Sequence, residues 1–132
     1  MYFDVFTISA VVDELKARAV GGRVQDVIDL NETALGLEVY AARQRHYLVL
    51  DADPQRPRVH FVEGKLRRGL DRPTQLGLLM RRYGEGAFIA GVSQPPWERV
   101  ITLHIDGVSG VSDLIVEAIE RRANILLVQE GL

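Results

Sequence analysis

Hydrophobic and polar positions follow two different periods along this chain, and the change of period predicts its secondary structure. The first apolar stripe has the three- and four-residue spacing of a helix and consists of Ile8, Val11, Val12, Leu15 and Ala19. We expect an amphipathic helix over residues 9–20, capped at its start by Thr7 or Ser9 and ended by Gly21 and Gly22 in a left-handed turn.

A period of two follows the first helix and predicts a series of short strands. The expected strands cover residues 23–30, 35–41, 46–50, 58–62, 88–93, 99–105, 113–119 and 124–128. A second helix, capped by Thr74 and running to about Tyr83, separates the first four strands from the last four. Short turns between consecutive strands favour antiparallel pairing. The pattern therefore predicts an α+β fold in which two helices flank an antiparallel β-sandwich.

Length and composition add the expectation of one globular domain over residues 1–132. The chain is 47% apolar and 26% charged, it lacks cysteine, and no internal repeat is visible. A disulfide framework and a thiolate metal site are therefore excluded. No apolar run approaches the ~20 residues of a membrane helix, and Met1 to Asp4 lack the basic start of a signal peptide. We expect a cytoplasmic protein that does not contact membranes.

The charge is distributed unevenly, which the formal net charge of −2 conceals. Residues 56–82 carry a net charge of +6, because eight basic residues face two acidic ones, and the rest of the chain carries −8. An anionic partner responds to the local patch, since charges farther apart than about 10 Å are screened at 0.1 M salt. The segment is either a contact surface for such a partner or a solvated, arginine-rich loop.

Signatures of catalysis are missing. His46, His60 and His104 fall in three separate predicted strands without metal-ligand spacing. No phosphate-binding loop is present, since Gly84 and Gly86 end a helix instead of opening one. The serines lack the sequence context of a nucleophile elbow. We therefore predict a protein that is not an enzyme and that has no metal or cofactor.

Five short motifs, in order along the chain, resemble those of the NFACT N-terminal domain of bacterial fibronectin-binding protein A and RqcH-like proteins. They are Phe3-Asp4 with the following helix and Gly21-Gly22-Arg23-Val24; Arg58-Val59-His60-Phe61; Leu79-Met80-Arg81-Arg82-Tyr83; Gln94 with Glu98-Arg99-Val100-Ile101; and Leu114-Ile115-Val116-Glu117 with Asn124-Ile125-Leu126-Leu127-Val128. Each motif is weak alone, but the ordered set spans nearly the whole chain.

The resemblance implies a part in ribosome-associated quality control. Members of this family bind the large ribosomal subunit with its stalled peptidyl-tRNA, recruit tRNA and promote C-terminal alanine tailing of the stalled chain. The N-terminal domain handles tRNA, and its fold is related to the N-terminal domain of formamidopyrimidine-DNA glycosylases. Full-length members are much longer, so the chain is expected to be a fragment. The tRNA identity and the oligomeric state stay open.

By position, the resemblance assigns tRNA contacts to Asp4, Glu98 and Arg99. The family usually has Asp-Arg where this chain has Glu98-Arg99, which lengthens the acidic side chain by one methylene. Arg99 can offer a bidentate fork to a phosphate or base edge, and its alternative is a surface ion pair. Trp97 can stack on an unpaired base or cover the sandwich. Contacts to the RNA backbone are expected from Arg58, Arg67, Arg68, Arg81 and Arg82, with Lys65 and Arg72 in the same segment.

Three other functions remain for comparison. A DNA glycosylase of the related fold uses a proline amine at the second position, where this chain has Tyr2, so no DNA substrate is expected. An adhesin-type module would bind fibronectin or another protein, as the older family name suggests. A structural domain would bind RNA only together with neighbouring domains that this chain lacks.

Overall fold

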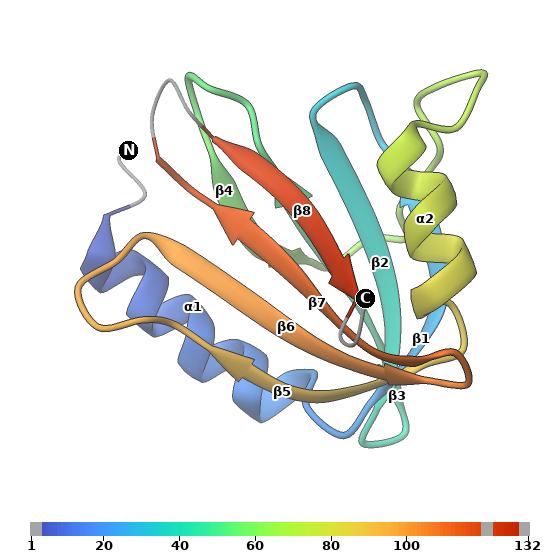
Figure 1. Cartoon of the computed structure of the whole chain (residues 1–132), viewed down its shortest axis with the longest axis horizontal. Coiled ribbons are helices and arrows are strands. Elements are labelled where there is room, and N and C mark those ends of the chain that lie inside the picture. The colour runs from blue at the N-terminus through green and yellow to red at the C-terminus, as the bar shows by residue number, and fades with distance from the viewer. Residues whose placement is uncertain (1–3, 120–122, 130–132) are drawn as a thin grey trace.

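The computed structural model describes residues 4–119 and 123–129 and contains two helices and eight strands (Figure 1). The helices are α1 (Val5–Arg18) and α2 (Gln75–Gly84). The strands are β1 (Arg23–Asp29), β2 (Ala34–Ala41), β3 (Gln44–Asp51), β4 (Arg58–Val62), β5 (Phe88–Ser93), β6 (Val100–Gly107), β7 (Gly110–Glu117) and β8 (Asn124–Gln129). Every pair of neighbouring strands is antiparallel. The α+β class and the element order are as predicted.

The two helices differ in how well the sequence predicted their starts. The hydroxyl of Thr74 accepts a hydrogen bond from the Gly77 amide at 2.9 Å, so α2 has the predicted cap. The predicted start of α1 was wrong. Asp4 is its N-cap and accepts from the Thr7 amide at 2.8 Å, so the helix begins at Val5, several residues earlier than expected.

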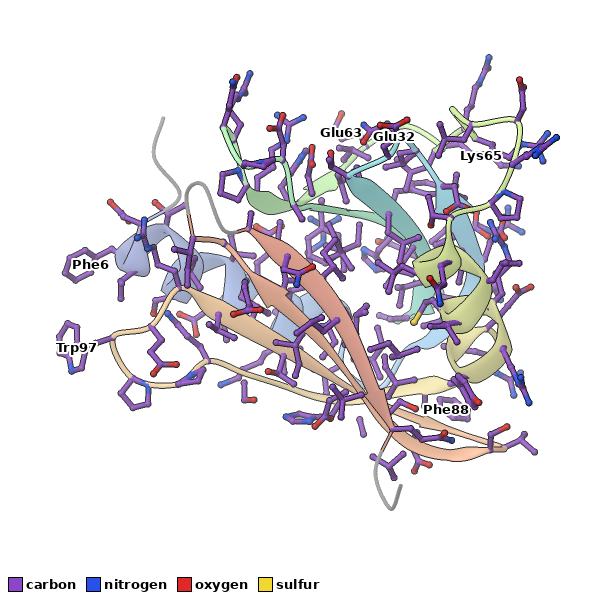
Figure 2. The ribbon with its side chains drawn as sticks, turned by 45° about the horizontal axis from the view of Figure 1, so that its top comes forward. Phe6, Glu32, Glu63, Lys65, Phe88 and Trp97 are labelled. Carbon is purple, nitrogen blue, oxygen red and sulfur yellow. The ribbon has the colours of Figure 1, made fainter. Side chains whose placement is uncertain are left out.

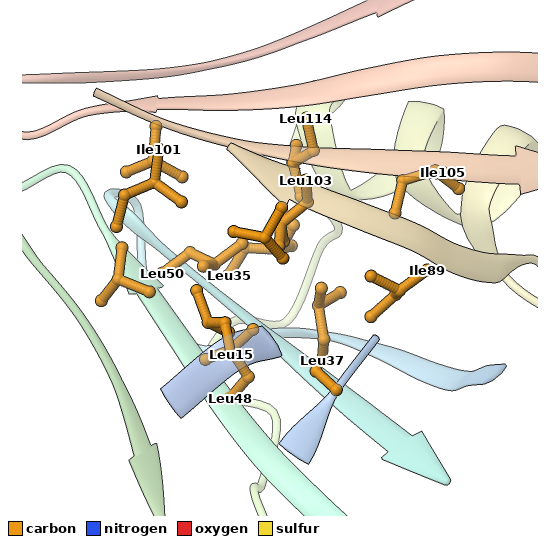
Figure 3. Packing of buried hydrophobic residues seen from close by; sticks show 14 of the residues in the cluster. Leu15, Leu35, Leu37, Leu48, Leu50, Ile89, Ile101, Leu103, Ile105 and Leu114 are labelled. Atoms are coloured by element: carbon orange, nitrogen blue, oxygen red, sulfur yellow. The ribbon is translucent and has the colours of Figure 1, made fainter. Parts of the chain in front are cut away.

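The sheet is continuous, which corrects the prediction of two separate sandwich layers. Its strand order is β4-β3-β2-β1-β5-β6-β7-β8, and β1 joins β5 where Arg23 lies opposite Phe88. The inner faces of its two halves nevertheless pack on each other. Figure 3 shows Leu37 and Leu48 of the first half in one cluster with Leu103 and Leu114 of the second half. The result is one sheet folded over a shared core.

The order of elements occurs twice, as a helix followed by four strands. Four backbone hydrogen bonds at the β1–β5 junction form two pairs, and each pair has one equivalent bond from either half. The Gly21 amide donates to the Ile89 carbonyl at 2.8 Å, and the Gly86 amide correspondingly donates to the Val24 carbonyl at 2.7 Å. The Val24 amide donates to the Ala87 carbonyl at 2.8 Å, and the Ile89 amide correspondingly donates to the Gly22 carbonyl at 2.9 Å. Gly21 and Gly86 leave their helices with φ of 86° and 84°, a conformation that favours glycine. The two halves are thus related by an approximate two-fold axis that the sequence does not reveal.

Burial of aliphatic side chains stabilises this arrangement. Leu15 of α1 and Met80 of α2 are both fully buried, so each helix contributes to the core between the sheet halves. Helix α1 packs against β4, β5 and β6, and α2 packs against β1, β6, β7 and β8. Each fully buried leucine or isoleucine contributes about 1.5–3 kcal/mol.

Candidate functional site

The N-terminus of α1 and the loop between β5 and β6 lie close together, and this brings four predicted site residues to one end of the molecule. Hydrogen bonds from Thr7 and the positive charge of Arg99 together lower the pKa of Asp4 below its ordinary value, with the Thr7 bonds contributing most. The Arg99 guanidinium is therefore within electrostatic reach of the α1 cap. Glu98 and Trp97 precede Arg99 in the same loop.

Local hydrogen bonds hold the β5–β6 loop in a defined turn. The side-chain amide of Gln94 donates to the Glu98 carbonyl at 2.9 Å, and the Glu98 amide donates to the Pro95 carbonyl at 3.1 Å. Trp97 sits inside this turn with a φ of 63°, an uncommon conformation for a residue other than glycine. The turn projects the indole into solvent, where 79% of the residue is exposed.

A second exposed aromatic ring stands beside Trp97. Phe6, in the first turn of α1, is 75% exposed, and Figure 2 shows it at the same end of the molecule as Trp97. A cavity of about 350 Å³ lies between the two segments, lined by Val5, Phe6, Ser9, Gln94, Pro96 and Trp97. The Asp4 carboxylate already caps the helix N-terminus, so the two accessible π faces and the arginine are the groups that suit a ligand with a planar ring and negative charge.

The remaining predicted contacts lie elsewhere and do not join this end. Lys65 marks the basic segment in Figure 2, far from Phe6 and Trp97 in that view. Arg67, Arg68 and Arg82 are exposed there, and Arg68 lines a cavity of about 240 Å³ together with Arg81. The structure thus separates the predicted residues into an aromatic site at α1 and a basic surface near α2.

Two of the predicted arginines make ion pairs within the protein. Arg58 Nε lies 3.7 Å from an Asp51 carboxylate oxygen. Arg81 donates to the Asp29 carboxylate at 2.8 Å and to the Val27 carbonyl at 2.9 Å. The guanidinium of Arg81 therefore stabilises the packing of α2 on β1, and its role in binding RNA stays a prediction.

Asp29 is a buried acid that sequence analysis missed, because it lies in a predicted strand among apolar neighbours. It accepts from the Thr74 hydroxyl at 2.7 Å, from the Thr74 amide at 3.2 Å and from Arg81. Burial raises its pKa, but these hydrogen bonds together outweigh burial and hold the pKa of Asp29 below its ordinary value. Its carboxylate occupies the N-terminus of α2, which is the position that a bound anion would take.

A relay of polar side chains crosses the outer face of β5, β6 and β7, and no sequence motif pointed to it. The Ser93 hydroxyl lies 3.0 Å from Nε2 of His104, whose Nδ1 lies 2.7 Å from an Asp113 carboxylate oxygen. These distances match those of a nucleophile, base and orienting acid. The His104 and Asp113 side chains are 38% and 41% exposed, so the group is in contact with water instead of the enclosed site that hydrolytic catalysis uses.

Over residues 4–119 and 123–129 the structure has neither a metal-ligand cluster nor a membrane-spanning helix. No cluster of three or more histidine, cysteine, aspartate or glutamate side chains could hold a metal ion in this part of the chain. None of its helices has the length and apolar character required to span a membrane. Tyr2 and Phe3, which bear on the glycosylase comparison and on the first motif, lie outside the described residues.

Comparison with known proteins shows similarity over nearly the whole chain. The curated protein "Rqc2 homolog RqcH" of Streptococcus pneumoniae is 29% identical over 99% of this chain, and that of Bacillus subtilis is 26% identical over 96%. The chain spans 24% and 23% of the length of these two relatives.

Solved structures match the fold closely. The N-terminal domain of the fibronectin-binding protein PavA from Streptococcus pneumoniae superposes with a TM-score of 0.90 at 28% identity, over 98% of this chain and 50% of that one. The N-terminal part of the fibronectin/fibrinogen-binding protein of Streptococcus suis has the same TM-score, identity and coverage. A sequence profile described as NFACT N-terminal and middle domains matches residues 4–131. The chain therefore belongs to the NFACT N-terminal domain family.

Proposed function

We propose that this chain is the tRNA-binding domain of a ribosome-associated quality control protein. In this proposal the whole protein binds large ribosomal subunits with a stalled peptidyl-tRNA in the cytoplasm and promotes C-terminal alanine tailing. The similarity to proteins named "Rqc2 homolog RqcH" supports the pathway. The exposed pair Phe6 and Trp97, beside Arg99 and the α1 N-terminus, is the observation that carries tRNA binding.

The geometry allows each site residue to contact a different part of the tRNA. An unpaired base can stack on Trp97 or Phe6, because both rings are mostly exposed and border one cavity. Arg99 supplies a planar guanidinium for a phosphate or base edge. Glu98 is exposed, so its carboxylate is available to orient that guanidinium or to accept from a 2′-hydroxyl. The basic surface near α2 adds contacts to the RNA backbone.

Binding of total tRNA to this chain at about 50 and 200 mM salt tests the proposal. We expect affinity that falls steeply with salt, and weaker binding by Arg99→Ala and Trp97→Ala. Arg56→Ala, at an exposed arginine in the β3–β4 turn, is the matched control and should bind like the parent. Equal loss in Arg99→Ala and Arg56→Ala, with Trp97→Ala binding like the parent, would show that binding follows total charge and not this site.

The alternative of a domain that needs its neighbours makes a different prediction. The chain spans about a quarter of the length of its curated relatives, so part of a tRNA site can lie in the remainder. In that case tRNA binding is absent here but present in the full-length protein, and Arg99→Ala there still lowers the tailing rate. An unchanged tailing rate in that variant would remove Arg99 from the mechanism.

A second candidate function comes from the names of the structural neighbours, two of which are called fibronectin-binding or fibronectin/fibrinogen-binding proteins. An exposed aromatic pair can also anchor a protein partner. Binding to immobilised fibronectin, compared between the parent and Trp97→Ala, tests this function. Fibronectin binding that requires Trp97, without tRNA binding by the chain or the full-length protein, would favour the adhesin alternative.

We further propose that the domain catalyses no reaction and that its fold is related to the N-terminal domain of formamidopyrimidine-DNA glycosylases. The sequence supports the first point, since Tyr2 stands where those enzymes carry a reactive proline. The exposed position of the Ser93, His104 and Asp113 relay also supports it. A comparison of this structure with glycosylase N-terminal domains, strand by strand, tests the relation of the folds.

A further inference from the structure

A row of alternating aromatic and basic side chains crosses four adjacent strands at the β1–β5 junction. Phe88 of β5 lies opposite Arg23 of β1, Arg23 lies opposite Tyr40 of β2, and Tyr40 lies opposite Arg45 of β3. Side chains that are directly opposite in neighbouring strands project from the same face of a sheet. These four residues form one continuous row, which we call the junction row, and it is bounded beyond Phe88 by the exposed Asp106 of β6.

The junction row faces solvent. The next positions along three of these strands, Val24, Val39 and His46, are buried, so their neighbours in the row point outward. Tyr40 is 42% exposed and Phe88 is 49% exposed, values that are high for aromatic residues within strands. The outward side is also hollowed, with a cavity of about 530 Å³ lined by Gly21, Arg23, Gln25, Tyr40, Ala41, Ala42 and Phe88.

Of the two arginines in the row, Arg23 is held by contacts within the protein and Arg45 is exposed to solvent. Arg23 Nε donates to the Gly86 carbonyl at 3.1 Å, and its guanidinium carbon lies 5.1 Å from the centre of the Phe88 ring. Arg45 is exposed beyond the point where β4 ends opposite Tyr47. Arg43 adds a third positive charge in the exposed β2–β3 turn.

The ligand that fits this surface has separated planar rings and negative charge between them. Tyr40 and Phe88 stand on strands two spacings apart, roughly 10 Å, with Arg23 on the strand between them. An acidic peptide would match the arginines but has no flat rings to stack on both aromatic side chains. Single-stranded RNA matches both, because unpaired bases stack on aromatic rings and phosphates pair with arginine. The Tyr40 hydroxyl and Gln25 amide can hydrogen-bond a 2′-hydroxyl, which DNA lacks.

We propose that the junction row binds a single-stranded RNA segment on the sheet face. The row begins at Phe88, the first residue of β5, and Trp97 lies beyond the end of that six-residue strand. Six residues of strand span about 20 Å, and Figure 2 places Phe88 and Trp97 in different regions of the molecule. The row is thus a second RNA site that does not depend on the tRNA site at α1.

Fluorescence anisotropy with a labelled oligouridine of about ten nucleotides tests the proposal on this chain. We expect Tyr40→Leu and Phe88→Leu each to raise the dissociation constant by about ten-fold. Tyr40→Phe keeps the ring and loses only the hydroxyl, so it should weaken RNA binding less than Tyr40→Leu does. Leu126→Ala, at an apolar residue of β8 that is 41% exposed and belongs to neither RNA site, is the control. The circular dichroism of each variant shows that the fold is intact.

The outcomes separate the two RNA sites. Oligouridine binding that needs both junction rings and is unchanged by Leu126→Ala supports the proposal, whatever the result for tRNA. It is overturned if the parent does not bind oligouridine at about 50 mM salt. It is also overturned if Tyr40→Leu and Phe88→Leu bind like the parent, or if oligothymidine DNA or a polyglutamate peptide binds at least as tightly as the RNA.

Discussion

Arg81 and Arg82 are neighbours on α2, but only the first is tied to a buried acid, so the pair allows a controlled test of the fold. Arg81 donates to the fully buried Asp29 at 2.8 Å and to the Val27 carbonyl at 2.9 Å, and its side chain is 29% exposed. Arg82 is exposed, with its guanidinium 5.3 Å from the centre of the Tyr83 ring. We predict that Arg81→Met destabilises the protein and that Arg82→Met does not.

The expected loss of stability in Arg81→Met depends on the hydrogen bonds that Asp29 keeps. Removing one partner of a fully buried ion pair costs about 3–5 kcal/mol. Partial exposure of Arg81 makes its pairing weaker than in that limit, and Asp29 keeps two hydrogen bonds from Thr74. The methionine side chain also preserves the apolar packing of the arginine stem. We therefore expect Arg81→Met to lower the free energy of unfolding by about 2–3 kcal/mol.

Urea unfolding followed by circular dichroism measures this difference. Arg82→Met should change the free energy of unfolding by less than about 0.5 kcal/mol. Equal effects in the two variants would refute the reasoning, since the substitution alone would then explain the loss. A stable Arg81→Met protein that binds tRNA weakly would show that Arg81 contacts RNA instead of serving mainly as the partner of Asp29.

Three other predictions follow from single features. The pKa of Asp29 lies below its ordinary value of 3.8, so the stabilisation by Asp29 is present above pH 3.8 and is lost as pH falls through the lowered pKa. Urea midpoints measured between pH 7 and pH 2 should fall accordingly, and the fall should be smaller in Asp29→Asn. Gly21→Ala, at a φ of 86°, should cost about 1–2 kcal/mol in urea unfolding, whereas Gly64→Ala, in open space and at an ordinary φ, should cost little. A fluorophosphonate probe should leave Ser93 unlabelled, and labelling that His104→Ala abolishes would contradict a domain without catalysis.

Local signals predicted much of the fold. Thr74 and the apolar stripe behind it defined α2, and alternation located all eight strands. The start of α1 was missed because Phe6 is apolar yet exposed, which interrupts the helical stripe at its first turn. The continuous sheet was missed because β1 and β5 pair across the interval of sequence that contains the other three strands of the first half and α2.

The candidate site was only partly visible in the sequence. Family resemblance indicated Asp4, Glu98 and Arg99, and the structure adds that the α1 cap and the β5–β6 loop lie together. Phe6 could not be chosen, since an apolar residue beside a helix is usually buried. The role of Asp29 also required the structure, because its partners Thr74 and Arg81 reach it only when α2 packs against β1.

The approximate two-fold repeat explains why the two helix N-termini are not equivalent sites. Each lies beside a loop between strands of the other half: the β5–β6 loop for α1, and the β1–β2 loop for α2. At α2 the carboxylate of Asp29 already accepts the Thr74 amide, so the positive end of the helix is neutralised from within. At α1 the cap residue Asp4 is itself the acid, since its carboxylate accepts the Thr7 amide at 2.8 Å, and the neighbouring loop presents Trp97 and Arg99. Both helix ends thus carry a carboxylate, and what distinguishes α1 is the exposed aromatic pair with Arg99 beside it, which is why substitutions at Arg99 should affect binding while those at Asp29 affect folding.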